Sequence, residues 1–201
     1  MTQFSLFDDN EHLIFPEGLL TYYPHFLEEA EGIALLNELI DTVPWKQSTL
    51  TIQDKVVLTP RLTAWYGDAG RSYRLSDKDF TPNPWTERLL SLKERIEDLT
   101  HLHFNCVLLN YYRDGNDSVA WHSDHERELG QHPNIASLSV GQARTFEFRN
   151  KKDHKRKYAL TLGNGSLLIM KGDLQQFWDH RIPKSTRNLR PRINLTFRII
   201  H

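Results

Sequence analysis

From residue 104 onward, the sequence is built from short apolar segments that are separated by turn-forming residues. Eight such segments follow one another, and their length and composition are typical of β-strands. They are FNCVLLNYY (104–112), VAWHSD (119–124), IASLSVG (135–141), RTFEFR (144–149), KYALTL (157–162), SLLIM (166–170), FWDHRI (177–182) and RINLTFRII (192–200). Eight short strands at this spacing predict a sandwich or jelly roll.

Two segments before residue 104 have the apolar spacing of helices. One is FLEEAEGIALLNELID (26–41), and the other is PWTERLLSLKERIEDLT (84–100), which has Pro84 at its start. Between them lies PRLTAWYGDAGRSYRL (60–75), whose Gly-Asp-Ala-Gly centre predicts a hairpin-like turn. We therefore expect an α+β, mainly β fold, in which residues 21–201 form a single domain behind an N-terminal tail (1–20).

Within that domain, helices and connecting segments occupy residues 21–103, and the β core occupies 104–201. The N-terminus lacks a basic region followed by a long apolar run, so no signal peptide is expected. No apolar run approaches the length of roughly 18 residues that spans a bilayer. The single cysteine, Cys106, lies in an apolar segment, where a packing role in a reducing cytoplasm is expected. We expect a cytoplasmic monomer without a membrane anchor, associated with the nucleoid if the host is bacterial.

The net charge of −1 conceals a sharp division along the chain. Residues 1–140 contain 11 Lys and Arg against 22 Asp and Glu, whereas residues 141–201 contain 14 against 4. Such asymmetry indicates a basic surface for an anionic partner, nucleic acid first among them. The alternative is that the two parts neutralise each other across the fold.

The stretch DSVAWHSDHEREL (117–129) is rich in side chains that could bind a metal. Because side chains alternate along a strand, His122 and Asp124 share one face while His125 points away. A third ligand must come from elsewhere, and Asp179 or His180 in QFWDHRIP could supply it, with His180 the better metal ligand. Two histidines and a carboxylate form the facial triad of non-haem Fe(II) oxygenases. Alone, His-x-Asp is a weak signal, and a solvated polar turn is the alternative.

The last predicted strand adds a second constraint. In RINLTFRII the polar side chains Arg192, Asn194, Thr196 and Arg198 fall on one face, and apolar side chains fall on the other. If the polar face lines the interior of a jelly roll, its two arginines need anionic partners, and a dicarboxylate cosubstrate would supply them. Asn110 and Tyr112 likewise share one face of their strand. The alternative is an amphipathic strand at the surface.

These motifs together resemble the AlkB family of Fe(II)/2-oxoglutarate dioxygenases, and most closely its nucleic-acid repair branch. The resemblance covers roughly residues 60–198 and includes NYYRDGNDSVAWHSDHERELG, IASLSVGQARTFEFR, GSLLIMKGDLQQFWDHRIPK and PRINLTFR. It implies a double-stranded β-helix core with a β-hairpin substrate lid, and it implies that His122, Asp124 and His180 hold catalytic iron. It also implies that Arg192 and Arg198 bind 2-oxoglutarate, with help from Asn110, Tyr112, Asn194 and Thr196.

The expected reaction uses Fe(II), 2-oxoglutarate and O2 to remove alkyl groups from bases of DNA, single- or double-stranded, or of RNA. A base must leave its stack to reach buried iron, which requires stacking surfaces and a positive track. The resemblance places the lid at 63–75, with Trp65, Tyr66 and Tyr73 as aromatic candidates and Leu75 where near relatives carry an aromatic residue. His125 and Glu126 are candidate contacts with the substrate base, and close relatives commonly carry an acid where His125 stands. The expected phosphate contacts are Arg149, Lys151, Lys152, Lys155, Arg156 and Lys157, for which a solvated hairpin tip is the alternative.

Three other functions compete with repair of nucleic acids. They are an AlkB-like hydroxylase of protein or another small substrate, a silent jelly-roll binding module, and a hydrolytic zinc site. The basic C-terminal part and the aromatic lid favour nucleic acid, and the two arginines disfavour the last two functions.

The N-terminal segment QFSLF (3–7) resembles the pentapeptide that binds the bacterial sliding clamp, although its apolar side chains could instead pack on the domain.

Overall fold

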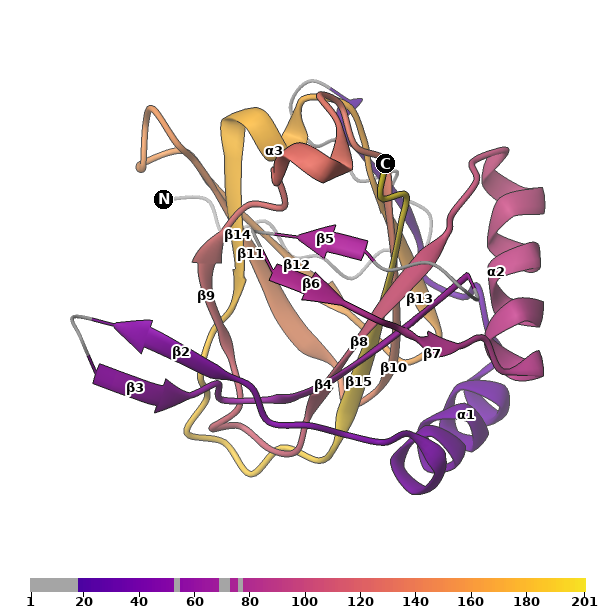
Figure 1. The fold of residues 1–201 in the computed structure, drawn as a ribbon. Coiled ribbons are helices and arrows are strands. Elements are labelled where there is room, and N and C mark those ends of the chain that lie inside the picture. Colours follow the sequence, from indigo (N-terminus) through magenta and orange to yellow (C-terminus); the bar gives the residue numbers. More distant parts are fainter. Residues whose placement is uncertain (1–17, 53–54, 69–72, 76–77) are drawn as a thin grey trace.

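Two antiparallel sheets form the body of the protein in a computed structural model that describes residues 18–52, 55–68, 73–75 and 78–201 (Figure 1). The large sheet has the order β1 (Leu20–Tyr23), β13 (Ser166–Met170), β10 (Ile135–Gly141), β15 (Arg192–Arg198), β8 (Cys106–Tyr112), β4 (Leu62–Gly67) and β7 (Asn83–Pro84). The small sheet has the order β12 (Lys157–Leu162), β11 (Arg144–Asn150), β14 (Trp178–Ile182) and β9 (Val119–His122). Only the short β4–β7 pair within these sheets is parallel.

All eight strands predicted from residue 104 onward are present, as β8 to β15, and the mainly β jelly-roll fold is confirmed. From β8 to β15 the chain passes repeatedly from one sheet to the other, and among these strands only β11 and β12 are consecutive partners. Strand β9, which follows β8 of the large sheet, lies at the edge of the small sheet and pairs with β14. This arrangement brings the segments that contain the candidate ligands into one interior. An apolar cluster with side chains from both sheets, including Phe148, Leu168 and Trp178, fills part of the space between the sheets.

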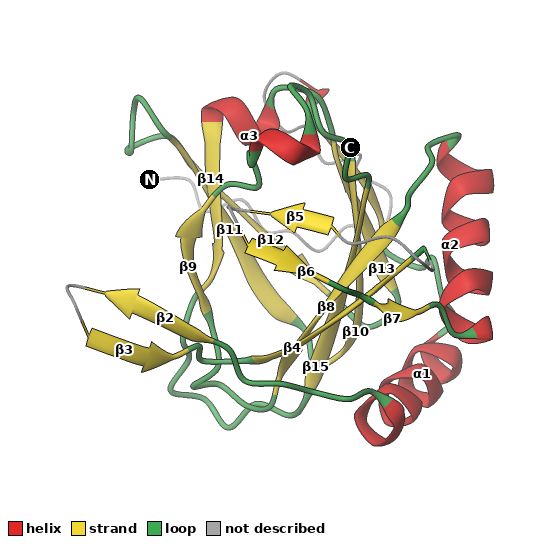
Figure 2. Ribbon diagram, in the orientation of Figure 1, coloured by secondary structure: helices red, strands yellow, loops and turns green. Residues whose placement is uncertain are grey.

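Both predicted helices are present and cover the outer face of the large sheet, as Figure 2 shows. Helix α1 spans Glu29–Thr42 and α2 spans Glu87–Thr100. The hydroxyl of Thr86 accepts a hydrogen bond from the Leu89 amide and caps α2, so the helix begins at Glu87 and Pro84 instead lies in β7. A short third helix, α3 (Leu174–Phe177), and a 3-10 turn (Arg127–Leu129) lie near the candidate ligands in the sequence.

Strand β15, in which polar and apolar residues alternate, is buried on both faces. Ile193, Leu195 and Phe197 belong to the main apolar cluster, together with the inward stripes of α1 and α2. The polar residues of β15 therefore face the space between the sheets and not the solvent. The surface-strand alternative is excluded by this burial.

The turn predicted at Gly-Asp-Ala-Gly (67–70) lies partly outside the described residues. Among the described residues, β4 pairs with β7 and β8, and β5 (Tyr73–Leu75) pairs with β6 (Lys78–Phe80). Besides the β5–β6 pair, the antiparallel pair of β2 (Thr49–Ile52) with β3 (Lys55–Leu58) projects from the body and was not predicted (Figure 1).

The candidate clamp motif at residues 3–7 lies outside the described residues. No helix in the described ranges has the length and apolar character needed to cross a membrane.

Candidate functional site

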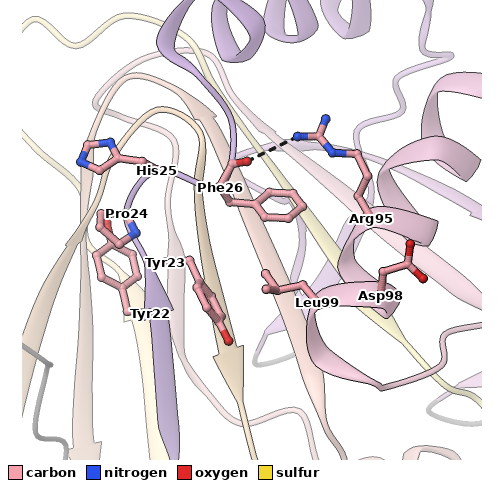
Figure 3. A pocket seen from close by; sticks show the side chains of 8 residues that line it. All are labelled: Tyr22, Tyr23, Pro24, His25, Phe26, Arg95, Asp98 and Leu99. Atoms are coloured by element: carbon pink, nitrogen blue, oxygen red, sulfur yellow. Dashed lines mark hydrogen bonds between the residues drawn. The ribbon is translucent and has the colours of Figure 1, made fainter.

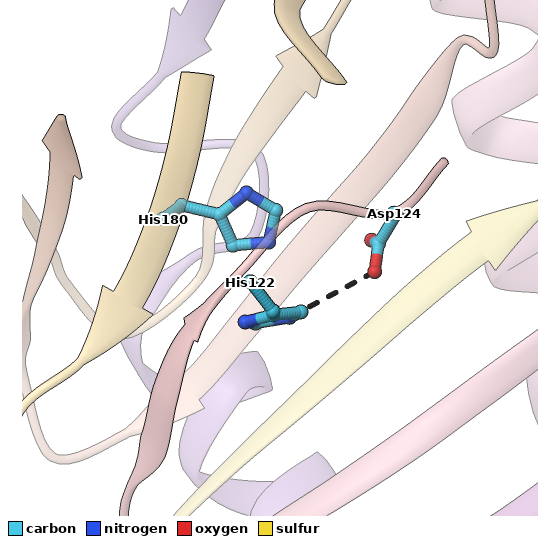
Figure 4. A group of neighbouring side chains, drawn as sticks. All are labelled: His122, Asp124 and His180. Atoms are coloured by element: carbon cyan, nitrogen blue, oxygen red, sulfur yellow. Dashed lines mark ion pairs between the residues drawn. The ribbon is translucent and has the colours of Figure 1, made fainter. Parts of the chain in front are cut away.

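Three potential metal ligands converge at the junction of β9 and β14 (Figure 4). The ligand atoms of His122, Asp124 and His180 all lie within 4.8 Å of one another. His122 and His180 face each other directly in the antiparallel register of their strands, with ring centroids 4.3 Å apart. Within the described part of the chain, these three residues form the one group with a metal-binding arrangement. Asp179, the other third-ligand candidate, is bonded to Arg149 instead.

Local contacts orient the two histidine side chains. The Nδ1 atom of His122 lies 2.9 Å from the carbonyl oxygen of Ala120, so Nδ1 can donate while Nε2 faces Asp124 Oδ1 at 3.8 Å. Such a bond to one ring nitrogen fixes the tautomer that offers the other nitrogen to a metal. His180 is buried against the ring of Phe146, at a centroid distance of 5.1 Å.

The charges within this group suit a divalent cation. Burial alone would raise the pKa of the Asp124 carboxyl, but the positive charge of Arg198 and the two imidazoles outweigh burial and lower the pKa to about 2. Burial is the main reason that the pKa of His180 falls to about 3. At neutral pH the group thus presents an ionised carboxylate and a neutral imidazole, the forms that bind metals.

A cavity of about 190 Å³ opens from the three ligands into the space between the sheets. All six residues predicted to bind a dicarboxylate line this cavity: Asn110, Tyr112, Arg192, Asn194, Thr196 and Arg198. Asn194 donates to Ser137 Oγ at 2.8 Å, and Thr196 donates to Asn194 Oδ1 at 2.9 Å. The polar face of β15 is therefore ordered by hydrogen bonds before any ligand is present.

The two arginines of this wall differ in how their donors are used. Arg192 donates from Nη2 to Ser139 Oγ at 2.9 Å, whereas its buried Nε and Nη1 have no partner within the described residues. Burial is the main cause that lowers the pKa of Arg192 to about 10, so the group still carries its charge at neutral pH. Arg198 donates from Nη2 to Asp124 Oδ2 at 2.7 Å, and its Nε is unpartnered in the same part of the chain. Buried N–H groups without acceptors are costly and indicate the place of an anionic ligand.

The predicted base contacts divide between the cavity and other places. Trp65 and Glu126 line the cavity, and Glu126 Oε2 is buried without a partner among the described residues. His125 is exposed, and its Nδ1 lies 2.8 Å from Ser123 Oγ. The expectation for Tyr66 is corrected, because it follows Trp65 on β4 and is buried on the opposite face, in the apolar cluster beneath the helices. The side chains of Tyr73 and Leu75 lie outside the described residues.

The predicted phosphate contacts lie at the end of β11 and in the hairpin that follows. Lys152, Lys155 and Lys157 are exposed there. Arg149 is paired with Asp179 at 2.9 Å and lies over the ring of Trp121 at 4.6 Å, and the guanidinium of Arg156 lies 5.4 Å from the ring of Trp178. Lys151 points toward Ser123.

Sequence patterns did not reveal several residues that shape the site. Arg61 lines the cavity and donates from Nε to Asn110 Oδ1 at 2.8 Å. Ser137 and Ser139 of β10 support β15, and their alternation within IASLSVG was the signal that could have identified them. Gln175 of α3 accepts a hydrogen bond from the Asp124 amide, and nothing in its local sequence indicates that contact.

A larger pocket, of about 730 Å³, lies outside the sheets between the segment 22–26 and α2 (Figure 3). Arg95 donates to the carbonyl oxygen of Phe26 at 3.4 Å, and its guanidinium lies 5.2 Å from the Phe26 ring. These contacts attach the turn before α1 to α2. The walls are mostly aromatic and aliphatic, with no set of converging ligands among their described side chains.

Comparisons with known proteins agree with this geometry. The family model described as the 2OG-Fe(II) oxygenase superfamily matches residues 19–198. The chain is 44% identical over 188 residues to the alpha-ketoglutarate-dependent dioxygenase alkB homolog 3 of Homo sapiens, covering 89% of this chain and 65% of that protein. It is 38% identical over 194 residues to the DNA oxidative demethylase ALKBH2 of Mus musculus, covering 92% of this chain and 81% of that protein.

A likeness of fold extends to a more distant solved structure. The structure of OsALKBH1 superimposes with a TM-score of 0.64 at 14% sequence identity, over 92% of this chain and all of that chain. As for length, the chain spans 65% of the murine alkB homolog 3, which is just under two thirds, and 81% of the murine ALKBH2 protein.

Proposed function

Because the chain belongs to the AlkB family of the 2OG-Fe(II) oxygenase superfamily, we propose that it is a 2-oxoglutarate-dependent dioxygenase that removes N-alkyl groups from nucleic-acid bases. One observation carries the proposal. A His-Asp-His group, in which Asp124 and His180 are buried and His122 is half-buried, opens directly onto a cavity whose wall holds two arginines with unpartnered N–H groups among the described residues. A metal site joined to a dicarboxylate site requires this combination, which a hydrolytic zinc centre does not.

The residues present fit Fe(II). Two imidazoles and one carboxylate on a single side are the ligand set of non-haem Fe(II) oxygenases, and His122, Asp124 and His180 supply it. When bound, the metal supplies the reductive activation of O2. The chain holds the His180 imidazole neutral and the Asp124 carboxylate ionised, and it leaves the side toward the cavity free of further protein ligands among the described residues.

The two arginines take different ends of 2-oxoglutarate in this proposal. Arg192, which Ser139 holds in place by accepting from Nη2, receives the distal carboxylate, because two guanidinium nitrogens of Arg192, Nε and Nη1, still need acceptors. Arg198 lies beside the metal ligand Asp124, so it serves the end of the cosubstrate nearest the metal. Asn194, Thr196 and Tyr112 order the wall between the two ends.

The overall reaction balances without a protein nucleophile. One oxygen atom of O2 enters succinate as 2-oxoglutarate loses CO2, and the other enters the N-alkyl carbon. For an N-methyl base, the C–N bond of the resulting hydroxymethyl group breaks, its electron pair stays on the base nitrogen, the hydroxyl proton passes to that nitrogen or to solvent, and the carbon leaves as formaldehyde. The task of the chain is to place the alkyl group beside the metal and to hold the cosubstrate in register.

Alkylated DNA or RNA is the proposed substrate. The murine relative of which this chain covers 81% is named a DNA oxidative demethylase. Trp65 at the cavity offers a stacking face, and the unpartnered Glu126 oxygen can accept a hydrogen bond from a base amino group. The exposed lysines 152, 155 and 157 lie on a hairpin next to the small sheet and would contact phosphates.

The decisive experiment incubates the protein with Fe(II), 2-oxoglutarate and oligonucleotides that contain 1-methyladenine or 3-methylcytosine. Single-stranded DNA, double-stranded DNA and RNA form separate arms. We expect stoichiometric formaldehyde and restored bases, and none of either without 2-oxoglutarate. Uncoupled succinate production with no base restored in any arm would favour an AlkB-like hydroxylase with a protein or other small substrate.

We further propose a monomeric cytoplasmic enzyme that reaches DNA through a bacterial sliding clamp. In this proposal one domain extends to residue 201 from β1, which begins at Leu20 and not after it, and the residues before that domain form a tail. The buried free Cys106 suits a reducing compartment. The support for the clamp is the pattern Gln3-Phe4-Ser5-Leu6-Phe7. Binding of a peptide of residues 1–12 to a bacterial clamp, compared with the same peptide carrying Leu6→Ala and Phe7→Ala, tests it. Equal binding of the two peptides would exclude the motif.

A further inference from the structure

The backbone of the metal ligand Asp124 lies beyond the end of its strand. Strand β9 ends at His122, and the pairing of β9 with β14 fixes His122 and His180 directly opposite each other. Asp124 has no strand partner in the described part of the chain, so the ladder that places the two histidines does not place the carboxylate. Another contact must hold this loop.

Gln175 of α3 makes that contact. Its Oε1 accepts a hydrogen bond from the Asp124 amide at 2.9 Å, and its side chain is only 1% exposed. The Nε2 atom of Gln175 lies 3.6 Å from Met170 Sδ, which fixes the amide plane from the other side. A buried amide held at both ends has little freedom to follow a displaced loop.

Lys151 at the end of β11 ties the same two segments together. Its Nζ donates to Ser123 Oγ and to the Gln175 carbonyl oxygen, both at 2.7 Å. The ammonium group therefore bridges the residue before Asp124 and the helix that holds the Asp124 amide. Neither partner of this ammonium is an acid, so the bridge orients two segments and does not neutralise a charge.

We propose that Gln175 and Lys151 are positioning residues that hold the Asp124 carboxylate at the distance from the two histidines that a metal requires. This inference rests on the proposed function only in so far as His122, Asp124 and His180 bind a metal. Substitution of groups that orient metal ligands commonly weakens metal affinity by about 10- to 100-fold. A purely structural role would lower the melting temperature and leave the affinity of the folded protein unchanged.

The test measures Mn(II) affinity of the full chain from the electron paramagnetic resonance signal of free Mn(II), without turnover. Gln175→Met keeps length and volume but removes the acceptor, and Lys151→Met keeps the aliphatic stem but removes the ammonium. Gln176→Met, at the exposed next position of α3, is the matched control. We expect affinity to fall about 10-fold in the first two variants and to stay within twofold of wild type in the control.

Melting curves recorded alongside separate folding from positioning. Wild-type Mn(II) affinity in folded Gln175→Met and Lys151→Met would overturn the inference, however much their melting temperatures fall. If Gln175→Met does not fold, Lys151→Met and Ser123→Ala replace it in the test. These two variants remove the donor and the acceptor, respectively, of the partly buried hydrogen bond from Lys151 Nζ to Ser123 Oγ. Absence of Mn(II) binding by the wild type would instead contradict the three-ligand site and hence the proposed function.

Discussion

Arg198 and Asp124 form a buried ion pair in which Arg198 Nη2 donates to Asp124 Oδ2 at 2.7 Å, although 74 residues separate them in sequence. Each side chain is 7% exposed, so water cannot replace either partner. The pair therefore balances the charge of a metal ligand, and it links the metal site to the cosubstrate wall.

The first prediction concerns removal of the arginine from this pair. Arg198→Met leaves the Asp124 carboxylate buried without its counter-charge, which costs about 3 kcal/mol of unfolding free energy in the metal-free protein. Saturating Mn(II) should recover part of that loss in the variant, because the cation offsets the same carboxylate. Urea unfolding with and without Mn(II) measures both quantities. A loss of equal size in the two conditions would contradict a shared role for Asp124.

The second prediction distinguishes the proposed metal ligand Asp124 from His125, the residue that follows it in His-Ser-Asp-His-Glu. Asp124→Ala should abolish Mn(II) binding at millimolar metal and, with it, formaldehyde release. His125→Ala should bind Mn(II) as wild type does, because His125 is not part of the converging group. Calorimetric titration of both variants decides the matter, and a loss of metal affinity in His125→Ala would show that the loop holds its ligands differently.

The third prediction assigns the distal carboxylate of 2-oxoglutarate to Arg192. Arg192→Met should weaken 2-oxoglutarate binding to the Mn(II)-loaded protein by about 100-fold, since it removes the charge-assisted hydrogen bonds to the cosubstrate. The matched ligand is 2-oxobutyrate, which lacks the distal carboxylate and should bind the variant and the wild type about equally. If both ligands lose affinity alike, Arg192 acts on the shape of the cavity and not on that carboxylate.

The residues whose place in the site could be predicted are those whose position follows from alternation alone. Arg192 and Arg198 lie six residues apart on one strand, and His122 and Asp124 lie two apart, so each pair shares a side whatever the topology. Alternation held for Asp124 even though β9 ends two residues earlier.

Alternation does not predict which face of a strand lines the cavity. It also does not predict which segments, distant in sequence, contact that face. Trp65 and Tyr66 are equally plausible from sequence, but helices α1 and α2 cover the face on which Tyr66 lies. Gln175 and Lys151 contact the loop that holds Asp124 across 51 and 28 residues, through backbone and hydroxyl groups that no local pattern marks.

The fourth prediction concerns stability at a distance from the site. Asp117 is buried and accepts hydrogen bonds from the backbone amide, Nε and Nη2 of Arg113. Burial alone would raise the pKa of Asp117, but the bonds from Arg113 outweigh it and the pKa is lowered. The ionised form is therefore favoured by folding, and its stabilisation is complete above the ordinary pKa and declines as pH falls through the lowered one.

Asp117→Asn should accordingly cost about 2 kcal/mol of unfolding free energy at pH 7. The difference from wild type should shrink as the pH falls below the ordinary pKa of an aspartate and through the lowered pKa of Asp117, because protonation removes the charge that the bonds from Arg113 stabilise. Urea titrations at pH 7, 5 and 3.5 measure it. A difference that stays constant over this range would mean that the asparagine disturbs packing and that the charge of Asp117 contributes little.

The last prediction tests the basic hairpin as a track for phosphates. Lys152 and Lys155 are exposed between β11 and β12, and Lys157 is exposed at the start of β12; this hairpin lies on the opposite side of the molecule from α2 (Figure 1). Changing all three to Gln should weaken binding of a methylated single-stranded oligonucleotide and lower the slope of log affinity against log salt by about 0.7 for each phosphate that no longer has a lysine partner. The matched control removes three positive charges from α2, at Arg88, Lys93 and Arg95, where each is paired with a glutamate. Because both variants lose the same net charge, a long-range effect would lower the two slopes equally, whereas direct binding of phosphates by the hairpin lowers only the slope of the hairpin variant.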